Sequence, residues 1–145
     1  GICFDIGEFS LNKDIIVLNT KLIKSANNCY MIGICFDTID NLIVGGFYKN
    51  TTIENMMFFS YNGFIYRKGL VYKKQLENGK QVTQSSLMHE NDILTMIIDI
   101  EKDKIEFKIN GNLIEEINDM NIKEKRDLLK ICIDMVDNQD TIKFI

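Results

Sequence analysis

The sequence contains no proline, no tryptophan and only one histidine in 145 residues. No stretch reaches the roughly 18 consecutive apolar residues of a membrane-spanning helix, and no apolar leader opens the chain. Lysine and arginine are spread along the chain among acidic residues, and the net charge is −4. A nucleic-acid-binding surface needs clustered basic side chains that neutralise phosphates. We therefore expect no membrane span and no nucleic-acid partner.

Cysteine is present but is not arranged for metal binding. The four cysteines, Cys3, Cys29, Cys35 and Cys132, lie within or beside apolar segments and form no CxxC pair, and His89 has no cysteine near it in the sequence. Because zinc sites require clustered soft ligands, we predict no metal and no cofactor. Buried reduced thiols are typical of a reducing cytosol, so the predicted location is intracellular and cytoplasmic.

Apolar residues are abundant enough to build a core. They make up 46% of the chain, which excludes a disordered protein. A chain of 145 residues is the size of one domain and can bury a sizeable core. We expect residues 1–145 to form a single domain of a larger protein that is monomeric in isolation.

Residues 91–117 carry the clearest structural pattern and predict three consecutive strands. Residues 104–110 alternate between apolar and polar side chains, which is the period of a strand with one face on a core. Asn110-Gly111 supplies two residues that tolerate positive φ, as a type I′ hairpin turn requires. Residues 93–100 are apolar on both faces almost throughout, which predicts a buried central strand. The charged turn 101–104 is expected to lie in solvent.

The rest of the chain consists of short strand-like segments separated by glycine, asparagine and aspartate turns. Gly33 lies within the apolar segment 29–36, where a missing side chain permits close approach of another backbone. Residues 128–136 and 141–145 are predicted to pair as a closing hairpin. Because about ten or more such segments occur without a convincing amphipathic helix, the predicted fold is all-β.

Short motifs spread along the chain resemble those of the SPRY domain family. The most specific is IEFKING, a strand at residues 105–111 that ends in an Asn-Gly hairpin and follows an aspartate-bearing strand. The other motifs are Ile32-Gly33-Ile34, Ser60-Tyr61-Asn62-Gly63 with Tyr66, NDILTMIIDI at residues 91–100, and LKICI at residues 129–133 with Ile142-Lys143-Phe144. The resemblance covers residues 14–145. It implies two antiparallel sheets packed as a bent β-sandwich, a jelly roll related to concanavalin-like lectins.

The resemblance also implies a function. SPRY domains are non-catalytic protein–protein interaction modules that present loops at one end of the sandwich to a peptide segment or a partner surface. Carried over to this sequence, the candidate contact loops are residues 37–42 and 136–139. We add Tyr48, a tyrosine expected at the tip of a strand, to the predicted contact residues, because tyrosines are frequent at the centres of interfaces. The predicted partner-binding residues are Thr38, Asp40, Asn41, Tyr48, Val136, Asp137 and Asn138.

Three alternatives stand beside this prediction. A glycan-binding, lectin-like sandwich predicts a secreted chain with disulfides and with a calcium cage or sugar-stacking aromatics. A glycoside hydrolase would use Asp99 and Glu101, whose spacing on a strand puts both carboxyls on one face. However, Asp99 matches the strand aspartate of the SPRY resemblance, and Glu101 begins a charged turn. We therefore predict that the protein is not an enzyme. A purely structural domain inside an assembly is the third alternative.

Overall fold

The structure is a computed structural model that describes residues 2–5, 14–24, 30–36, 56–60, 64–67, 70–74, 76–77, 80–81, 88–135 and 141–145. Within these ranges the chain forms thirteen strands and one short 3-10 helix, η4 (Arg126–Leu128). The all-β prediction is confirmed. Among these residues, no helix has the length and apolar character needed to cross a membrane.

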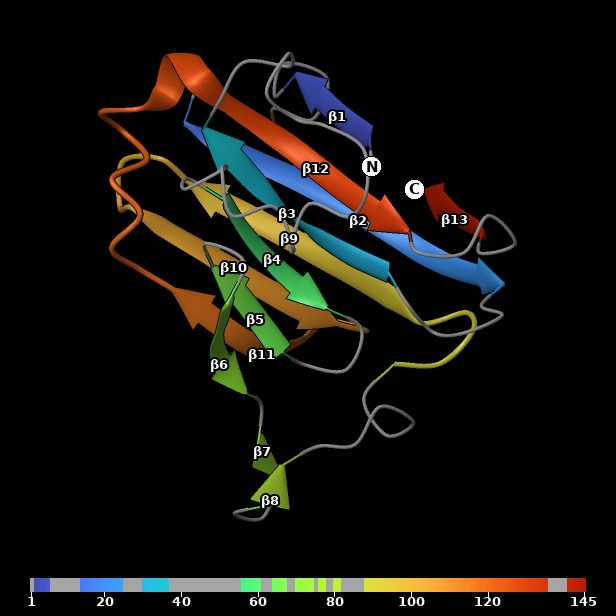
Figure 1. Ribbon diagram of the computed structural model, residues 1–145. Coiled ribbons are helices and arrows are strands. Elements are labelled where there is room, and N and C mark those ends of the chain that lie inside the picture. Colours follow the sequence, from blue (N-terminus) through green and yellow to red (C-terminus); the bar gives the residue numbers. More distant parts are fainter. Residues whose placement is uncertain are drawn as a thin grey trace.

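Most strands belong to two antiparallel sheets that pack as a β-sandwich (Figure 1). Sheet A has six strands, in the spatial order β1 (Ile2–Asp5), β12 (Leu129–Met135), β3 (Tyr30–Phe36), β4 (Met56–Ser60), β5 (Phe64–Arg67) and β6 (Leu70–Lys74). Sheet B has five, in the order β11 (Asn112–Ile117), β10 (Lys104–Ile109), β9 (Ile93–Asp99), β2 (Ile15–Lys24) and β13 (Thr141–Phe144). A separate two-stranded hairpin pairs β7 (Leu76–Glu77) with β8 (Lys80–Gln81).

The predicted three-strand unit is confirmed as β9, β10 and β11, which are consecutive neighbours in sheet B. Asn110 and Gly111, between β10 and β11, have φ values of 51° and 82°, as a type I′ turn requires. Strand β9 is central, because β10 pairs with one of its edges and β2 with the other. Its residues alternate between buried and half-buried, so only one of its faces is fully covered.

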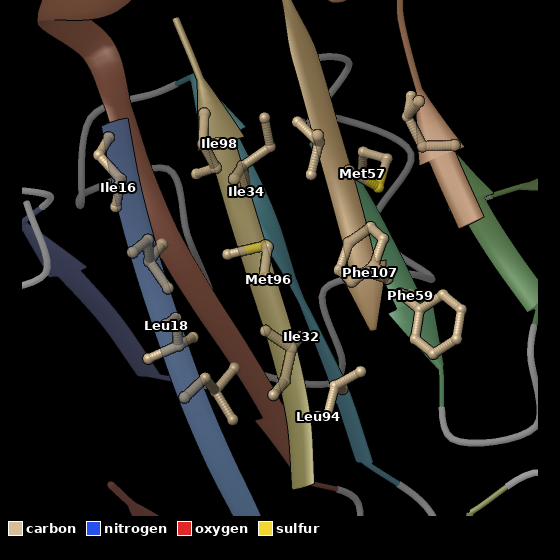
Figure 2. Packing of buried hydrophobic residues seen from close by; sticks show 14 of the residues in the cluster. Ile16, Leu18, Ile32, Ile34, Met57, Phe59, Leu94, Met96, Ile98 and Phe107 are labelled. Carbon is tan, nitrogen blue, oxygen red and sulfur yellow. The ribbon is translucent and has the colours of Figure 1, made fainter. Parts of the chain in front are cut away.

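The core lies between the two sheets and is formed mainly by buried residues of β2, β3, β4, β9, β10, β11 and β12 (Figure 2). On β10 these are Ile105, Phe107 and Ile109, and the polar residues between them point away from the core. The Phe107 ring stacks on Phe59 of sheet A, with centroids 4.8 Å apart and an interplanar angle of 17°. Phe58, on the opposite face of sheet A, is also buried. Phe58 and Phe59 are therefore both buried in the packing of sheet A.

The predicted closing hairpin is wrong, because its two strands lie in different sheets. β12 lies between β1 and β3 in sheet A, whereas β13 pairs with β2 at the edge of sheet B. β12 buries residues on both of its faces, including Ile131 on the core side and Cys132 on the other. Such a strand is most stable between two neighbours inside a sheet. The chain therefore crosses from one sheet to the other after Met135.

Candidate partner-binding site

The predicted contact residues lie outside the part of the chain that the structure describes: Thr38, Asp40, Asn41, Tyr48, Val136, Asp137 and Asn138. The strands that lead into the two predicted loops are described. β3 ends at Phe36, directly before loop 37–42, and β12 ends at Met135, directly before loop 136–139. The positions of these strand ends define where each loop starts.

The two predicted loops start at opposite ends of one pair of strands. In the antiparallel pairing of β3 with β12, Phe36 lies opposite Leu129 and Tyr30 lies opposite Met135. Six residue steps along a strand span about 20 Å. Loops 37–42 and 136–139 therefore leave sheet A about 20 Å apart. β12 neighbours the edge strand β1, whereas β3 lies further inside the sheet.

Charged side chains surround the end of β3 from which loop 37–42 starts. The Lys125 ammonium lies 5.3 Å from the centroid of the buried Phe36 ring, a cation–π distance. The adjacent Arg126 donates a hydrogen bond of 3.0 Å to a carboxylate oxygen of Asp14, just before β2. These contacts attach the connection between β11 and β12 to both sheets at this end of the sandwich.

Asp103 attaches the same connection to the β9–β10 turn. Its two carboxylate oxygens accept hydrogen bonds from the backbone N–H groups of Asn121 and Ile122, at 3.2 and 3.1 Å. Nearby, Lys123 pairs with Glu101 at 2.9 Å, and this hydrogen bond raises the pKa of Lys123. The prediction that the turn simply lies in solvent is wrong for Asp103, which is half-buried. The described residues at this end of the sandwich therefore form a rim in which Arg126 pairs with Asp14 and Lys123 pairs with Glu101.

Asn110 organises the opposite end. Its side-chain oxygen accepts a hydrogen bond from the Ile93 N–H at 2.9 Å, and its amide group donates to an Asp92 carboxylate oxygen at 2.9 Å. Asn91, which precedes Asp92 in the chain, donates its backbone N–H to the carbonyl of Leu22 in β2 at 2.6 Å. The Asn-Asp and Asn-Gly motifs that carry the SPRY resemblance thus contact each other, and they have a structural role.

The two carboxylates of the hydrolase alternative also have structural roles. Asp99 is the last residue of β9, and its carboxylate accepts a hydrogen bond from the Lys102 N–H at 3.1 Å. Glu101 lies beyond the strand, in the turn, where it pairs with Lys123. Both groups stabilise the β9–β10 turn and its contact with the following connection.

The rim contacts were not predictable from local sequence patterns. Asp14 and Arg126 are separated by 112 residues, and Asp103 and Ile122 by 19. Residues 123–127 (KEKRD) show only that this connection is charged. Which of its charges meets which partner depends on the pairing of whole strands.

No protein-family model and no curated protein sequence matches the chain. Among solved structures, the chain is similar to the crystal structure of the SPRY domain of human HERC1. The TM-score is 0.55 at 17% sequence identity, and the match covers 90% of this chain and 74% of the other. At this identity the match establishes the fold. This match and the arrangement of the strands in two sheets agree with the motifs found in the sequence. The chain has the fold of an SPRY domain.

Proposed function

We propose that the chain is a non-catalytic protein–protein interaction module that recognises a peptide segment or a partner surface. The observation that carries the proposal is the structural similarity to an SPRY domain, which extends over 90% of the chain. Residues 1–145 act as one such domain of a larger protein. The contacts are made by the loops at residues 37–42 and 136–139, together with Tyr48.

The strands that lead into these loops give the proposed contacts a firm base. β3 and β12 are paired over their whole lengths, and the core-facing side chains described on them are buried: Ile32, Ile34, Phe36, Leu129, Ile131 and Ile133. At Phe36, the cation–π contact and the Arg126–Asp14 pair hold the surrounding rim in place. A partner that binds beside such paired strands is expected to cause little movement of their backbone.

Two further observations favour a non-catalytic intracellular protein. Asp99 and Glu101, the carboxylates that a hydrolase would use, are engaged in hydrogen bonding of the β9–β10 turn. Cys35 and Cys132 are fully buried. Buried cysteines of this kind agree with the reducing intracellular location that we propose.

Quantitative binding to an identified partner tests the proposal. Affinity capture with the full chain followed by mass spectrometry identifies a protein partner, and calorimetry measures its Kd. Because the two loops start at opposite ends of β3 and β12, Asp40→Lys and Asp137→Lys are measured separately. We expect at least one of them to raise Kd about tenfold or more, the size of effect expected for a lost interface contact.

Glu116→Lys is the matched control, because this partly exposed residue lies on sheet B rather than in either loop. It should bind as the wild type does, and all variants should retain the wild-type circular dichroism spectrum. If Asp40→Lys and Asp137→Lys both bind with wild-type affinity, the loop assignment is wrong. Binding to immobilised glycans instead of a protein would favour the lectin alternative.

A further inference from the structure

Two cysteines lie side by side on the face of sheet A that points away from sheet B. The Cys132 thiol donates a hydrogen bond to the Cys35 sulfur, and the sulfurs are 3.1 Å apart. Neither residue is in a disulfide, and both side chains are 0% exposed. Because their strand neighbours Ile34 and Ile131 belong to the core between the sheets, the two thiols project to the other face.

The register of β3 and β12 brings the two sulfurs together. Cys132 lies directly opposite Gly33, and Cys35 lies opposite Lys130, so the cysteines are diagonal neighbours. Since Gly33 has no side chain, the Cys132 sulfur can lean across the strand pair towards Cys35. On the other edge of β12, the backbone of Cys3 lies directly opposite Cys132, which makes Cys3 the competing partner that an experiment must exclude.

We propose that Cys35 and Cys132 form a reversible oxidation site at which hydrogen peroxide converts the two thiols into an intramolecular disulfide. The sulfurs have to approach by only about 1 Å, from 3.1 Å to the length of a disulfide bond. Complete burial excludes large or charged oxidants such as oxidised glutathione, whereas hydrogen peroxide is small and uncharged. The other buried side chains on this face include Met31 and Phe58.

The reaction has two steps. First, one cysteine sulfur attacks a peroxide oxygen, the O–O bond breaks, and a sulfenic acid and one water form. The second sulfur then attacks the sulfenic sulfur, the S–O bond breaks and a second water leaves. The two thiols lose two electrons and two protons, and one hydrogen peroxide molecule is reduced to two waters.

The disulfide would connect two strands that are adjacent in space but far apart in the chain. It closes a loop of roughly 100 residues between Cys35 and Cys132, and closing a long loop restricts the unfolded chain strongly. The folded protein should therefore melt at a higher temperature when oxidised, by about 5 °C or more. This effect does not depend on the proposed partner-binding function, so each can fail without the other.

The wild-type chain provides the first test. It is treated with hydrogen peroxide, remaining thiols are alkylated, and the tryptic digest is searched for disulfide-linked peptides. Cys29 and Cys35 fall in the same tryptic peptide, residues 25–49, so the Cys29→Ser variant is analysed in parallel to assign the bond. We expect a Cys35–Cys132 linkage in both proteins, and dithiothreitol should reverse it.

The Cys35→Ser and Cys132→Ser variants provide the second test. Peroxide should raise Tm in the wild type and in Cys29→Ser, and should leave it unchanged in these two variants. A linkage of Cys132 to Cys3 or Cys29 would overturn the proposal. The same holds if peroxide produces no linked peptide, or only singly oxidised cysteines, under conditions in which the protein stays folded.

Discussion

A residue with a side chain is disfavoured at Gly33 and at Gly111, for different physical reasons. A Cβ atom at Gly33 would lie 1.8 Å from the backbone oxygen of Met57 in the neighbouring strand β4. This is the close backbone approach that a glycine within a strand predicts. At Gly111 a Cβ atom would meet nothing within 4 Å, but φ is +82°, a conformation that disfavours other residues. The first position is restricted by packing and the second by backbone geometry.

The alanine variants of these two glycines should therefore differ in stability. Gly33→Ala collides with a backbone atom that cannot move without disturbing β4, so we expect a loss of at least about 3 kcal/mol. Gly111→Ala costs only the left-handed backbone conformation, about 1–2 kcal/mol. Urea denaturation followed by circular dichroism measures both. Equal losses for the two variants would contradict this distinction.

The Asn110 side chain makes a further residue-scale prediction. Asn110→Gly keeps the positive φ without strain but removes the hydrogen bonds to Ile93 and Asp92. We expect a loss of about 1–2 kcal/mol from the missing hydrogen bonds. Asn112→Ala, at an exposed neighbouring position, is the control and should change stability by less than about 0.5 kcal/mol. A wild-type stability for Asn110→Gly would show that the turn depends on backbone conformation alone.

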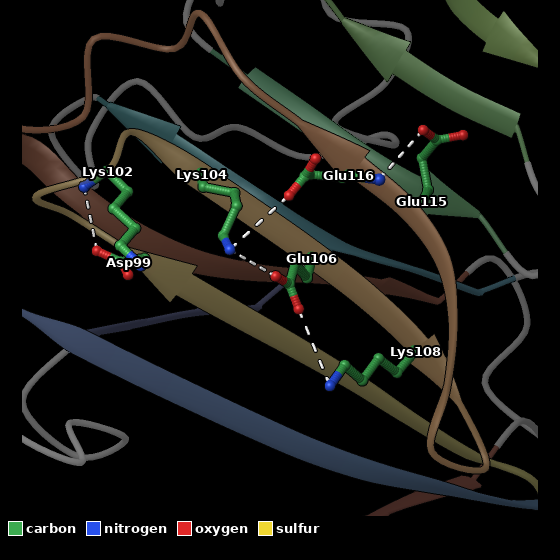
Figure 3. Close-up of polar contacts among 7 residues, drawn as sticks. All are labelled: Asp99, Lys102, Lys104, Glu106, Lys108, Glu115 and Glu116. Atoms are coloured by element: carbon green, nitrogen blue, oxygen red, sulfur yellow. Dashed lines mark hydrogen bonds and ion pairs between the residues drawn. The ribbon is translucent and has the colours of Figure 1, made fainter.

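At the scale of the elements, a row of alternating charges crosses the outer face of sheet B (Figure 3). Glu106 on β10 lies directly opposite Glu116 on β11. The Lys104 ammonium lies 2.8 Å from a Glu106 oxygen and 3.8 Å from a Glu116 oxygen, so it separates the two carboxylates. Lys108 approaches Glu106 from the other side at 3.9 Å. Like charges opposite each other destabilise a strand pair unless a cation is held between them.

Replacing Lys104 with glutamine should lower the urea midpoint, because it leaves Glu106 and Glu116 facing each other. The decrease should be smaller in 1 M NaCl, since salt screens exposed charges. The hydrogen bond to Glu106 raises the pKa of Lys104 above its ordinary value of 10.5. The stabilisation from Lys104 is therefore fully present below pH 10.5 and is lost as the pH rises through the raised pKa.

A pH series checks this assignment. The difference in midpoint between wild type and Lys104→Gln should be constant from about pH 7 to pH 9 and should shrink only above the ordinary lysine pKa. Lys143→Gln, an exposed change on the edge strand β13, is the control and should show a smaller difference in low salt. A difference for Lys104→Gln that is insensitive to salt would mean that packing of the lysine stem, and not its charge, is responsible.

The individual strands also differ in how well local sequence patterns predict their pairing. The alternation along β10 and the Asn110-Gly111 dipeptide are local features, and they correctly predicted the β9–β10–β11 unit. The pairing of β12 with β13 was wrong because a polar turn between two apolar segments looks the same in a hairpin and in a crossing between sheets. Only the neighbours of β12, which are β1 and β3, distinguish the two.

At the scale of the whole molecule, local sequence also did not determine how the two loops of the candidate site lie relative to each other. The resemblance selected loops 37–42 and 136–139 together, because SPRY domains present contact loops at one end of the sandwich. The antiparallel register places their starting points, Phe36 and Met135, at opposite ends of the β3–β12 pair. Strand direction and register arise from contacts between residues about 100 positions apart, and no local pattern encodes them.

The contact between the two sheets gives the last prediction. Phe59 of sheet A and Phe107 of sheet B stack with their centroids 4.8 Å apart, and both are 0% exposed. Phe107→Ala should cost about 3–5 kcal/mol, whereas Phe144→Ala, at a side chain 42% exposed on β13, should cost less than about 1 kcal/mol. The double variant Phe59→Ala/Phe107→Ala should be less destabilised than the sum of its single variants, by about 1 kcal/mol for the lost ring–ring contact.

Tyrosine fluorescence and far-ultraviolet circular dichroism, recorded during the same urea titration, should give coincident transitions if the sheets unfold together. Separate transitions, or equal losses for Phe107→Ala and Phe144→Ala, would mean that the sheets are stable independently of each other. In that case the packing between the sheets would not hold β3 and β12 in place, and the strands from which the proposed contact loops start would lose their support.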